Sequence, residues 1–266
     1  MPMTNIQSDM DFHNVFIFRR NEILVNKNTS FDLPNMSIYN KCMEYQLATD
    51  WFCEQEHQYT AVQLEHNAPE PTGCDWVPIR TLIGLQHDQA TLICRAAALL
   101  NWRAKTRFCS KCSSQLHNST DETARICLSC GTVFYPSLSP AMIVLVKKGE
   151  QILLARHRHR NTDVFTCLAG YVEAGESVEQ CVEREVKEES GITVTNICYQ
   201  ESQSWPFPDQ LMLAFTAEWK DGELTPQASE INELKWFNYD NLPPIPGKGS
   251  VAYKLIMKEL NRKTKN

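Results

Sequence analysis

A loop containing glycines, followed by a glutamate-rich helix in the segment 170–192, constrains this chain more than any other feature. The segment reads GYVEAGESVEQCVEREVKEESGI. Ser177 and Gln180 predict a capping box at the start of a helix, and Gly191 stands where helices commonly end in a left-handed conformation. Apolar side chains recur at three- and four-residue spacing, which predicts one buried face. That face comprises Val178, Cys181, Val182 and Val186.

Three glutamates share one face of this predicted helix. Glu185, Glu188 and Glu189 are spaced i, i+3 and i+4, so their side chains crowd together. Like charges at that spacing destabilise an isolated helix by about 0.2–0.5 kcal/mol per pair. A bound divalent cation removes this repulsion, and carboxylate oxygens suit Mg²⁺ or Mn²⁺ better than softer metals. The alternative interpretation is an ordinary solvated acidic face.

The full spacing of the segment resembles the Nudix box. Gly170 is followed after five residues by Glu176, and seven residues later the sequence REVxEExGI occupies positions 184–192. Every fixed position of the box is filled, so the chain is similar to the Nudix hydrolases. The resemblance implies an α/β fold, with an α/β/α sandwich around a mixed sheet, and metal-dependent cleavage of a phosphoanhydride.

Four cysteines form a second motif with metal-ligand spacing. Two Cys-x-x-Cys pairs, Cys109 with Cys112 and Cys127 with Cys130, are separated by fourteen residues. Four thiolates can close a tetrahedral zinc site, which leaves no open position for catalysis and predicts a structural zinc ribbon. Disulfides or redox-active dithiols are the alternatives. Only three basic residues lie in 106–138, a poor footprint for nucleic acid.

A third motif follows the box by about ten residues. The segment 202–212, SQSWPFPDQLM, resembles the S-Q-P-W-P-F-P-x-S signature of the NADH pyrophosphatases, also called NAD-capped RNA hydrolases. Two aromatic rings held by prolines form a stiff surface for a flat base or nicotinamide ring. A proline-rich turn packed into the core is the alternative. The chain departs from the signature at Ser204, in place of proline, and at Gln210, in place of serine.

The resemblance also implies roles for residues around the box. Arg184 is expected to orient the box glutamates by bidentate pairing, and Glu188 or Glu189 would be the general base. The expected catalytic set is Glu176, Arg184, Glu185, Glu188 and Glu189. The divalent metal would be held by the Ala169 carbonyl, Glu185, Glu189 and Glu230. Glu233 is the alternative to Glu230 as the fourth metal ligand.

The substrate site implied by the resemblance is more dispersed. Tyr171 would stack on a nucleotide base, and Tyr135 would reach into the substrate site of the other subunit of a homodimer. The remaining expected contacts are Gln203, Trp205, Phe207, Pro208, Gln210 and Met212, with Glu122, Ala252 and Arg80 on weaker positional matches. For Arg80 an ordinary surface arginine is the alternative.

The order of the motifs predicts three domains: an N-terminal α+β domain over 1–105, the zinc ribbon over 106–138 and a Nudix domain over 139–266. In the first, strands are expected at 15–18 and 22–25, and a helix capped by Asp88 at 90–102. In the last, strands are expected at 141–146, 151–155, 197–203, 211–220 and 233–238, with a final helix at 250–258. No internal repeat is visible in the sequence.

Composition limits the binding partners and the cellular location that can be expected. The net charge of −6 argues against broad binding to nucleic-acid phosphates. The seven cysteines outside the zinc motif are scattered and odd in number, which indicates reduced thiols and a cytoplasmic protein. No apolar run is long enough to span a bilayer, and the N-terminal residues lack the pattern of a signal peptide.

These motifs together predict an enzyme that hydrolyses the pyrophosphate bond of NAD(H) to nicotinamide mononucleotide and AMP, and that removes NAD caps from RNA 5′ ends. Hydrolysis of ADP-ribose or another nucleoside diphosphate derivative is the alternative within the family. A non-catalytic zinc-ribbon binding module is the alternative outside it.

Overall fold

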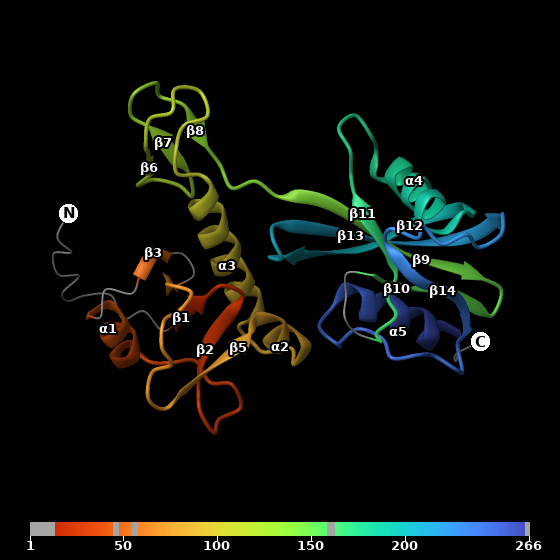
Figure 1. Cartoon of the computed structure of the whole chain (residues 1–266), viewed down its shortest axis with the longest axis horizontal. Helices are drawn as coiled ribbons and strands as arrows, with labels where there is room; N and C mark the ends of the chain where they lie inside the picture. Colours follow the sequence, from red (N-terminus) through yellow and green to blue (C-terminus); the bar gives the residue numbers. More distant parts are fainter. Residues whose placement is uncertain (1–13, 45–47, 55–57, 159–162, 264–266) are drawn as a thin grey trace. The chain divides into compact units, whose positions relative to one another are not determined.

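The computed structural model describes residues 14–44, 48–54, 58–158 and 163–263 (Figure 1). The chain divides into two compact units, one formed by residues 1–82 and 89–136 and the other by residues 83–88 and 137–266. The zinc-motif segment up to residue 136 therefore belongs to the first unit. The three-domain division at 105 and 138 stays a prediction.

The first unit is built on a five-stranded sheet of order β3-β4-β1-β2-β5. The first two strands each contain a continuous apolar run, and both of their faces are buried around Phe16 and Leu24. The elements are β1 (Asn14–Arg19), β2 (Glu22–Asn26), α1 (Met36–Glu44), β3 (Ala48–Glu54), β4 (Tyr59–Leu64), β5 (Cys74–Pro78), α2 (Ile79–Gly84) and α3 (Ala90–Lys105). The predicted first strands are confirmed. The predicted Asp88 cap is wrong, because Gln89 is the N-cap of α3 and its side chain makes no capping hydrogen bond.

The four-cysteine segment forms its own small sheet at the end of this unit. Its strands are β6 (Leu116–Asn118), β7 (Arg125–Cys127) and β8 (Val133–Phe134), all antiparallel. A small apolar cluster of Leu116 with the cysteines supports it. So small a core cannot by itself stabilise a separate fold, which is why such segments depend on a metal.

The second unit is an α/β/α sandwich around a mixed sheet of order β12-β13-β9-β10-β14, with β11 pairing β9. Strand β13 runs parallel to β9 and the other pairs are antiparallel. Figure 1 shows α4 and α5 on opposite faces of the sheet. The elements are β9 (Ser139–Lys148), β10 (Gln151–His157), β11 (Leu168–Tyr171), α4 (Val178–Ser190), β12 (Thr193–Trp205), β13 (Gln210–Asp221), β14 (Ile231–Asn238) and α5 (Val251–Lys263).

Each face of this sheet has its own apolar core. Cys181, Val182 and Val186 of α4 pack against one face, as the periodicity of the sequence predicted. Leu255 and Ile256 of α5 pack against the other. The predicted α/β/α architecture is thereby confirmed. Among the described residues, none of the helices combines the length and the apolarity needed to span a bilayer.

The two large sheets share one topology, although no repeat is visible in the sequence. In β3-β4-β1-β2-β5 and in β12-β13-β9-β10-β14, the second and third strands are parallel and the other neighbours antiparallel. Helix α1 holds the place of α4 in chain order but contains a single glutamate, Glu44. The first unit thus has the sheet topology of the second unit, but its helix α1 lacks the glutamate cluster of α4.

Candidate active site

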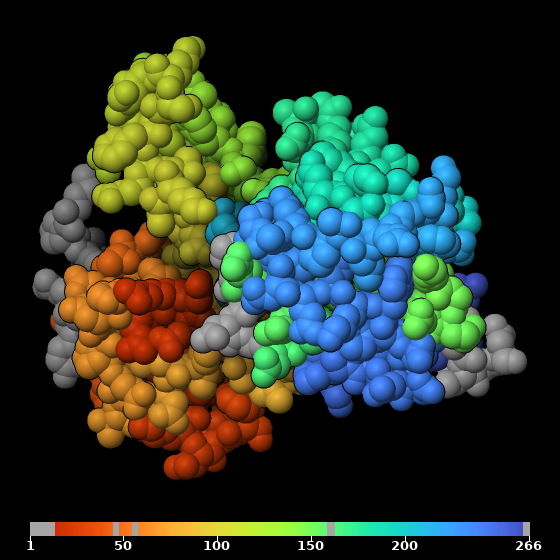
Figure 2. Space-filling view, turned by 45° about the vertical axis from the view of Figure 1, so that its right-hand side comes forward, coloured from red at the N-terminus to blue at the C-terminus, as the bar shows by residue number. Residues whose placement is uncertain are grey.

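Helix α4 starts and ends as its sequence predicted. Ser177 Oγ accepts a hydrogen bond from the Gln180 backbone N–H at 3.2 Å, and Gln180 Oε1 accepts from the Ser177 N–H at 2.8 Å. Gly191 ends the helix with φ of 77°. Figure 2 shows the loop and helix (teal) at the surface of the second unit. The helix is therefore held at both ends, with Glu185 beside Gly170 and Glu189 hydrogen-bonded to the Ala169 backbone of β11.

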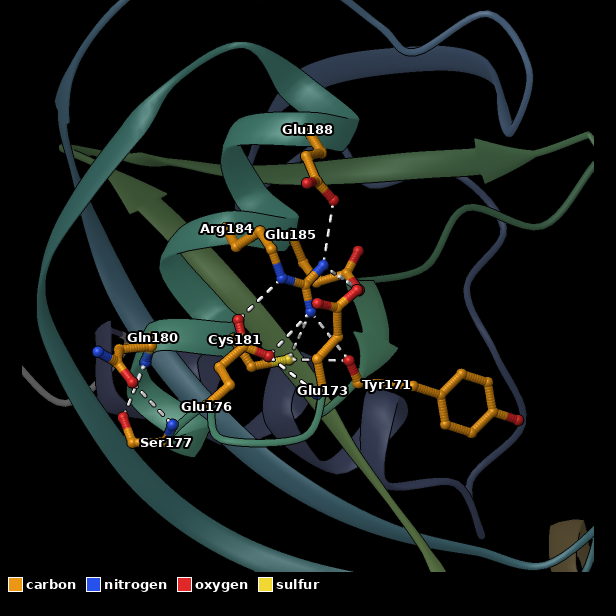
Figure 3. A network of polar contacts seen from close by, with 9 residues as sticks. All are labelled: Tyr171, Glu173, Glu176, Ser177, Gln180, Cys181, Arg184, Glu185 and Glu188. Carbon is orange, nitrogen blue, oxygen red and sulfur yellow. Dashed lines mark hydrogen bonds and ion pairs between the residues drawn. The ribbon is translucent and has the colours of Figure 1, made fainter.

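Arg184 is the centre of a carboxylate network (Figure 3). Its Nε and Nη2 atoms donate to the two oxygens of Glu176 at 2.8 and 3.0 Å, the predicted bidentate pairing. Its Nη1 atom lies 2.9 Å from Glu185 and 3.1 Å from Glu188. Because of the Arg184 hydrogen bonds, the pKa of Glu176 falls to about 2 and the pKa of Arg184 rises. Arg184 thus acts as a fixed counter-ion that orders three carboxylates.

The box glycine is required by a close approach. A Cβ atom added at Gly170 would lie 1.9 Å from Cδ of Glu185, far inside van der Waals contact. Glu185 is mostly buried, with a side chain 15% exposed, so it has little room to withdraw. The absence of a side chain at position 170 therefore lets the Glu185 carboxylate lie directly against β11.

We expect Gly170→Ala to lower kcat by about 10²-fold, the usual cost of misplacing a catalytic group by about 1 Å. The new methyl group must push the Glu185 carboxylate out of its position. Steady-state kinetics measures the effect, with Gly84→Ala as control because a Cβ there meets nothing within 4 Å. Normal turnover by Gly170→Ala would contradict the need for close approach.

Glu189 is the most strongly perturbed carboxyl of the cluster. Glu189 is only 1% exposed, and its Oε2 atom has no hydrogen-bond partner. Burial, with smaller contributions from the negative charges of Glu185 and Glu230, raises its pKa to about 8. A hydrogen bond from the Ala169 backbone opposes this rise. A buried, unpartnered carboxylate oxygen beside two further carboxylates is costly unless a cation accompanies it.

These residues fit a divalent cation by their donor set. Burial also raises the pKa of Glu185, and the charge of Glu230 adds to the effect on both Glu185 and Glu189. Glu233, the predicted competitor, instead pairs with Arg156 at 3.1 Å and with Lys235, and these partners lower its pKa. Glu230 is therefore the better candidate ligand. Within the described residues, the glutamates do not bring three ligand oxygens within 4.8 Å of one another.

The aromatic signature lies at the hairpin between β12 and β13. The rings of Trp205 and Phe207 meet edge to face with centroids 5.2 Å apart. Pro208 is exposed, whereas Met212 and Ala252 are buried in the core beneath α5. Gln203 Nε2 donates to the Gly249 carbonyl and its Oε1 accepts from the Val251 N–H, both at 2.8 Å. Its amide thus joins β12 to the start of α5.

The residues predicted to hold the metal and those predicted to bind the nucleotide base lie on opposite faces of the sheet. Tyr171 pairs with Ala141 of β9, which also pairs with Met212 of β13, so these side chains share the face beneath α5. Gly170, one residue earlier, turns toward α4 and Glu185. Figure 3 shows the Tyr171 ring pointing away from the Arg184 network. The end of β11 thus separates the two groups of residues.

The other predicted substrate residues belong to the first unit. The hydroxyl of exposed Tyr135 donates to Glu122 Oε1 at 3.0 Å, and Glu122 raises its pKa. Arg80 is exposed on α2. Sequence reasoning missed the contact between Gln203 and α5, and no local pattern could reveal it because its partners are backbone atoms 46 and 48 residues away.

The four cysteines converge as predicted. Their sulfur atoms lie within 4.8 Å of one another, with Cys109 to Cys130 at 3.6 Å and Cys112 to Cys127 at 3.4 Å. Sulfurs of a tetrahedral site with Zn–S near 2.3 Å are about 3.8 Å apart, so this set fits zinc. All four are free thiols, which excludes disulfides among them in this structure.

Both cysteine pairs are shaped by similar turns. Ser113 N–H donates to the Cys109 carbonyl and Gly131 N–H to the Cys127 carbonyl, each at 2.8 Å. Ser113 and Gly131 have φ of 59° and 71°. Each turn therefore presents its two sulfurs toward the common centre.

Comparisons with known proteins agree with this geometry. A family model described as NUDIX domain matches residues 137–258, and one described as NADH pyrophosphatase-like rudimentary NUDIX domain matches residues 13–102. The latter covers the sheet that shares its topology with the second unit.

Curated relatives span most of the chain. The protein of Chromobacterium violaceum named NAD-capped RNA hydrolase NudC is 45% identical over 189 residues, which cover 71% of each chain. The protein of the same name from Pseudomonas aeruginosa PAO1 is 44% identical over 203 residues, covering 76% of this chain and 73% of that one. A solved NUDIX hydrolase from Nitrosomonas europaea shares the fold, with a TM-score of 0.52, 23% identity, and coverage of 60% of this chain and 93% of that one.

Proposed function

Because this chain belongs to the Nudix family, we propose that it hydrolyses the pyrophosphate bond of NAD(H) and removes NAD caps from RNA 5′ ends. The products from NADH are reduced nicotinamide mononucleotide and AMP. From a capped transcript they are nicotinamide mononucleotide and a 5′-monophosphate RNA. The relatives named NAD-capped RNA hydrolase support this substrate class, as does the aromatic signature at the β12–β13 hairpin.

The observation that carries the proposal is the buried carboxylate of Glu189. Its unpartnered oxygen and raised pKa, together with the neighbouring charges of Glu185 and Glu230, mark a site where the ionised carboxylate is costly unless a cation offsets its charge. We propose that Glu185, Glu189, Glu230 and the Ala169 carbonyl hold Mg²⁺ or Mn²⁺. When bound, such an ion offsets charge on the phosphate oxygens and lowers the pKa of a coordinated water.

The chain's own groups then have distinct roles. Glu188 or Glu189 accepts a proton from the attacking water, whose oxygen forms the new bond to phosphorus as the bridging P–O bond breaks. Arg184 holds the carboxylates of Glu176, Glu185 and Glu188 in position through the ion pairs described above. On the other face of the sheet, Tyr171 and the hairpin aromatics contact the flat rings of the dinucleotide.

We propose that the zinc ribbon has a structural role and that the enzyme is a homodimer. Four large apolar side chains of the segment 106–136 are exposed: Phe108 at 61%, Leu128 at 73%, Val133 at 40% and Tyr135 at 59%. Several exposed apolar side chains on one small module are typical of a protein interface. In the dimer, Tyr135, Glu122 and Arg80 contribute to substrate binding. The division into an N-terminal domain, ribbon and hydrolase domain is part of this proposal.

We further propose a cytoplasmic location. Each of the eleven cysteines has a free thiol in the structure, including exposed Cys198 and half-buried Cys53. Thiols in this number are kept reduced in the cytosol.

Product analysis tests the function directly. The purified chain is incubated with NADH, ADP-ribose or NAD-capped RNA, each with Mg²⁺, with Mn²⁺ or without added metal, and products are identified by mass spectrometry. We expect nucleotide monophosphates from NADH and from the cap only with added metal, and at least tenfold slower cleavage of ADP-ribose. Efficient ADP-ribose cleavage with intact NADH would refute the substrate assignment and favour the alternative within the family.

A further inference from the structure

We propose that Gln210 is a positioning residue that fixes the ring of Tyr171 for stacking against the base of the dinucleotide. This inference rests on the proposed nucleotide substrate. It gives a role to the glutamine that replaces the final serine of the aromatic signature.

The contact itself is short and specific. Gln210 Nε2 donates to the Tyr171 hydroxyl at 2.6 Å, between β13 and β11. Tyr171 is 47% exposed, so its ring has a free face available to a ligand. An exposed tyrosine side chain ordinarily samples several rotamers, and a hydrogen bond at its far end selects one of them.

The backbone of Tyr171 is fixed from the opposite face. Its carbonyl accepts hydrogen bonds from Arg184 Nη2 at 3.0 Å and from Cys181 Sγ at 3.3 Å. Arg184 also contacts the box glutamates, so one residue connects the carboxylate cluster to the strand end that carries the base-stacking ring of Tyr171. With the backbone ordered by α4 and the ring ordered by Gln210, Tyr171 holds its ring in one position relative to the carboxylates.

The sheet explains why a glutamine is needed at this place. Strand β9 separates β11 from β13 and places Ser139 opposite Gln210 and Ala141 opposite Tyr171. Strands two apart are separated by about 10 Å, so two long side chains must meet above the intervening strand. Ser139 and Ala141 are small enough to leave that path open. A serine at position 210 would be too short to reach the hydroxyl.

A competing explanation is that Gln210 contacts the substrate directly. The two explanations differ in how mutations combine. If Gln210 acts through Tyr171, removal of the Tyr171 hydroxyl makes the loss of Gln210 silent. If Gln210 contacts the substrate, the two losses multiply.

The test is a double-mutant cycle on NADH binding, measured by NADH fluorescence without added divalent metal so that no turnover is required. We expect Gln210→Ala and Tyr171→Phe each to weaken the Kd about three- to tenfold, the usual effect of one net hydrogen bond. The double variant should bind no more weakly than either single variant. With Mg²⁺ present, KM should rise by the same factor in each variant and kcat should change less.

Matched controls separate this role from a loss of folding. Gln200→Ala removes a glutamine of the same sheet that bonds to Thr216 and Lys258 instead, and it should leave the Kd unchanged. Thermal melting of all variants checks the fold. Multiplicative effects, or an unchanged Kd in Tyr171→Phe, would overturn the proposal, as would absence of NADH binding by the parent chain. Binding without hydrolysis would instead refute the proposed reaction and leave this inference standing.

Discussion

We expect Glu189→Gln to lower kcat for NADH hydrolysis by about 10²–10⁴-fold, the range for loss of a general base, while the fold persists. The amide has nearly the same shape as the carboxyl group but carries no charge for a cation and accepts no proton from water. Steady-state kinetics with Mg²⁺ and circular dichroism measure the two parts of this expectation. Near-normal turnover would remove Glu189 from the mechanism.

Two comparisons sharpen this prediction. Glu188→Gln tests the other candidate base, whose side chain is 51% exposed and bonded to Arg184. A loss of similar size would assign the proton transfer to Glu188 and leave Glu189 as a ligand. Glu179→Gln is the control, because Glu179 lies in the first turn of α4 and outside the carboxylate network.

The pH dependence of unfolding provides a separate readout of Glu189. Burial raises its pKa from 4.5 to about 8, so the folded chain retains a proton that the unfolded chain releases. This contribution to stability is fully present below pH 4.5 and is lost as the pH rises through about 8. Without metal, Glu189→Gln should therefore be less sensitive to alkaline pH than the parent chain in denaturant titrations. Equal sensitivity would contradict the burial of a titrating carboxyl group.

The second large effect is expected in the zinc ribbon. Cys127→Ser should abolish zinc binding and unfold the segment 106–136, because structural zinc sites contribute about 10–16 kcal/mol to folding in small modules. Cys127 is fully buried at the end of β7, so no neighbouring group replaces its sulfur. Metal analysis by mass spectrometry and limited proteolysis measure the loss.

The matched control is Cys198→Ser, since Cys198 is an exposed free thiol of β12 outside the cysteine cluster. It should retain zinc and resist proteolysis like the parent chain. A zinc-free parent chain with an intact ribbon, or a Cys127→Ser variant with full zinc content, would contradict a metal-dependent ribbon.

Local patterns predicted much of the second unit. The period of the apolar residues, the capping box and the terminal glycine defined α4 almost to the residue, because helix ends are specified by side chains that contact neighbouring backbone. Cysteine spacing likewise predicted the four-sulfur cluster. The weaker alternation of β3 and β5, and the short β11, gave too little signal to be distinguished from loops.

Other features depended on contacts distant in sequence. The contact between Gly170 and Glu185 requires β11 to lie beneath α4, and the bond from Gln210 to Tyr171 crosses an intervening strand. Neither follows from spacing along the chain. The predicted Asp88 cap failed for a related reason, since packing of α3 rather than a local side-chain bond fixed its start.

The sequence by itself determined the chemistry: which carboxylates and thiolates stand at metal-binding intervals, and therefore which family of reactions the chain supports. The tertiary structure decided which of these groups are buried, which are neutralised by Arg184, and which face of the sheet each one meets. The reason is physical. Ligand type and helical spacing are local properties, whereas desolvation and the pairing of charges arise only when distant strands and helices pack together.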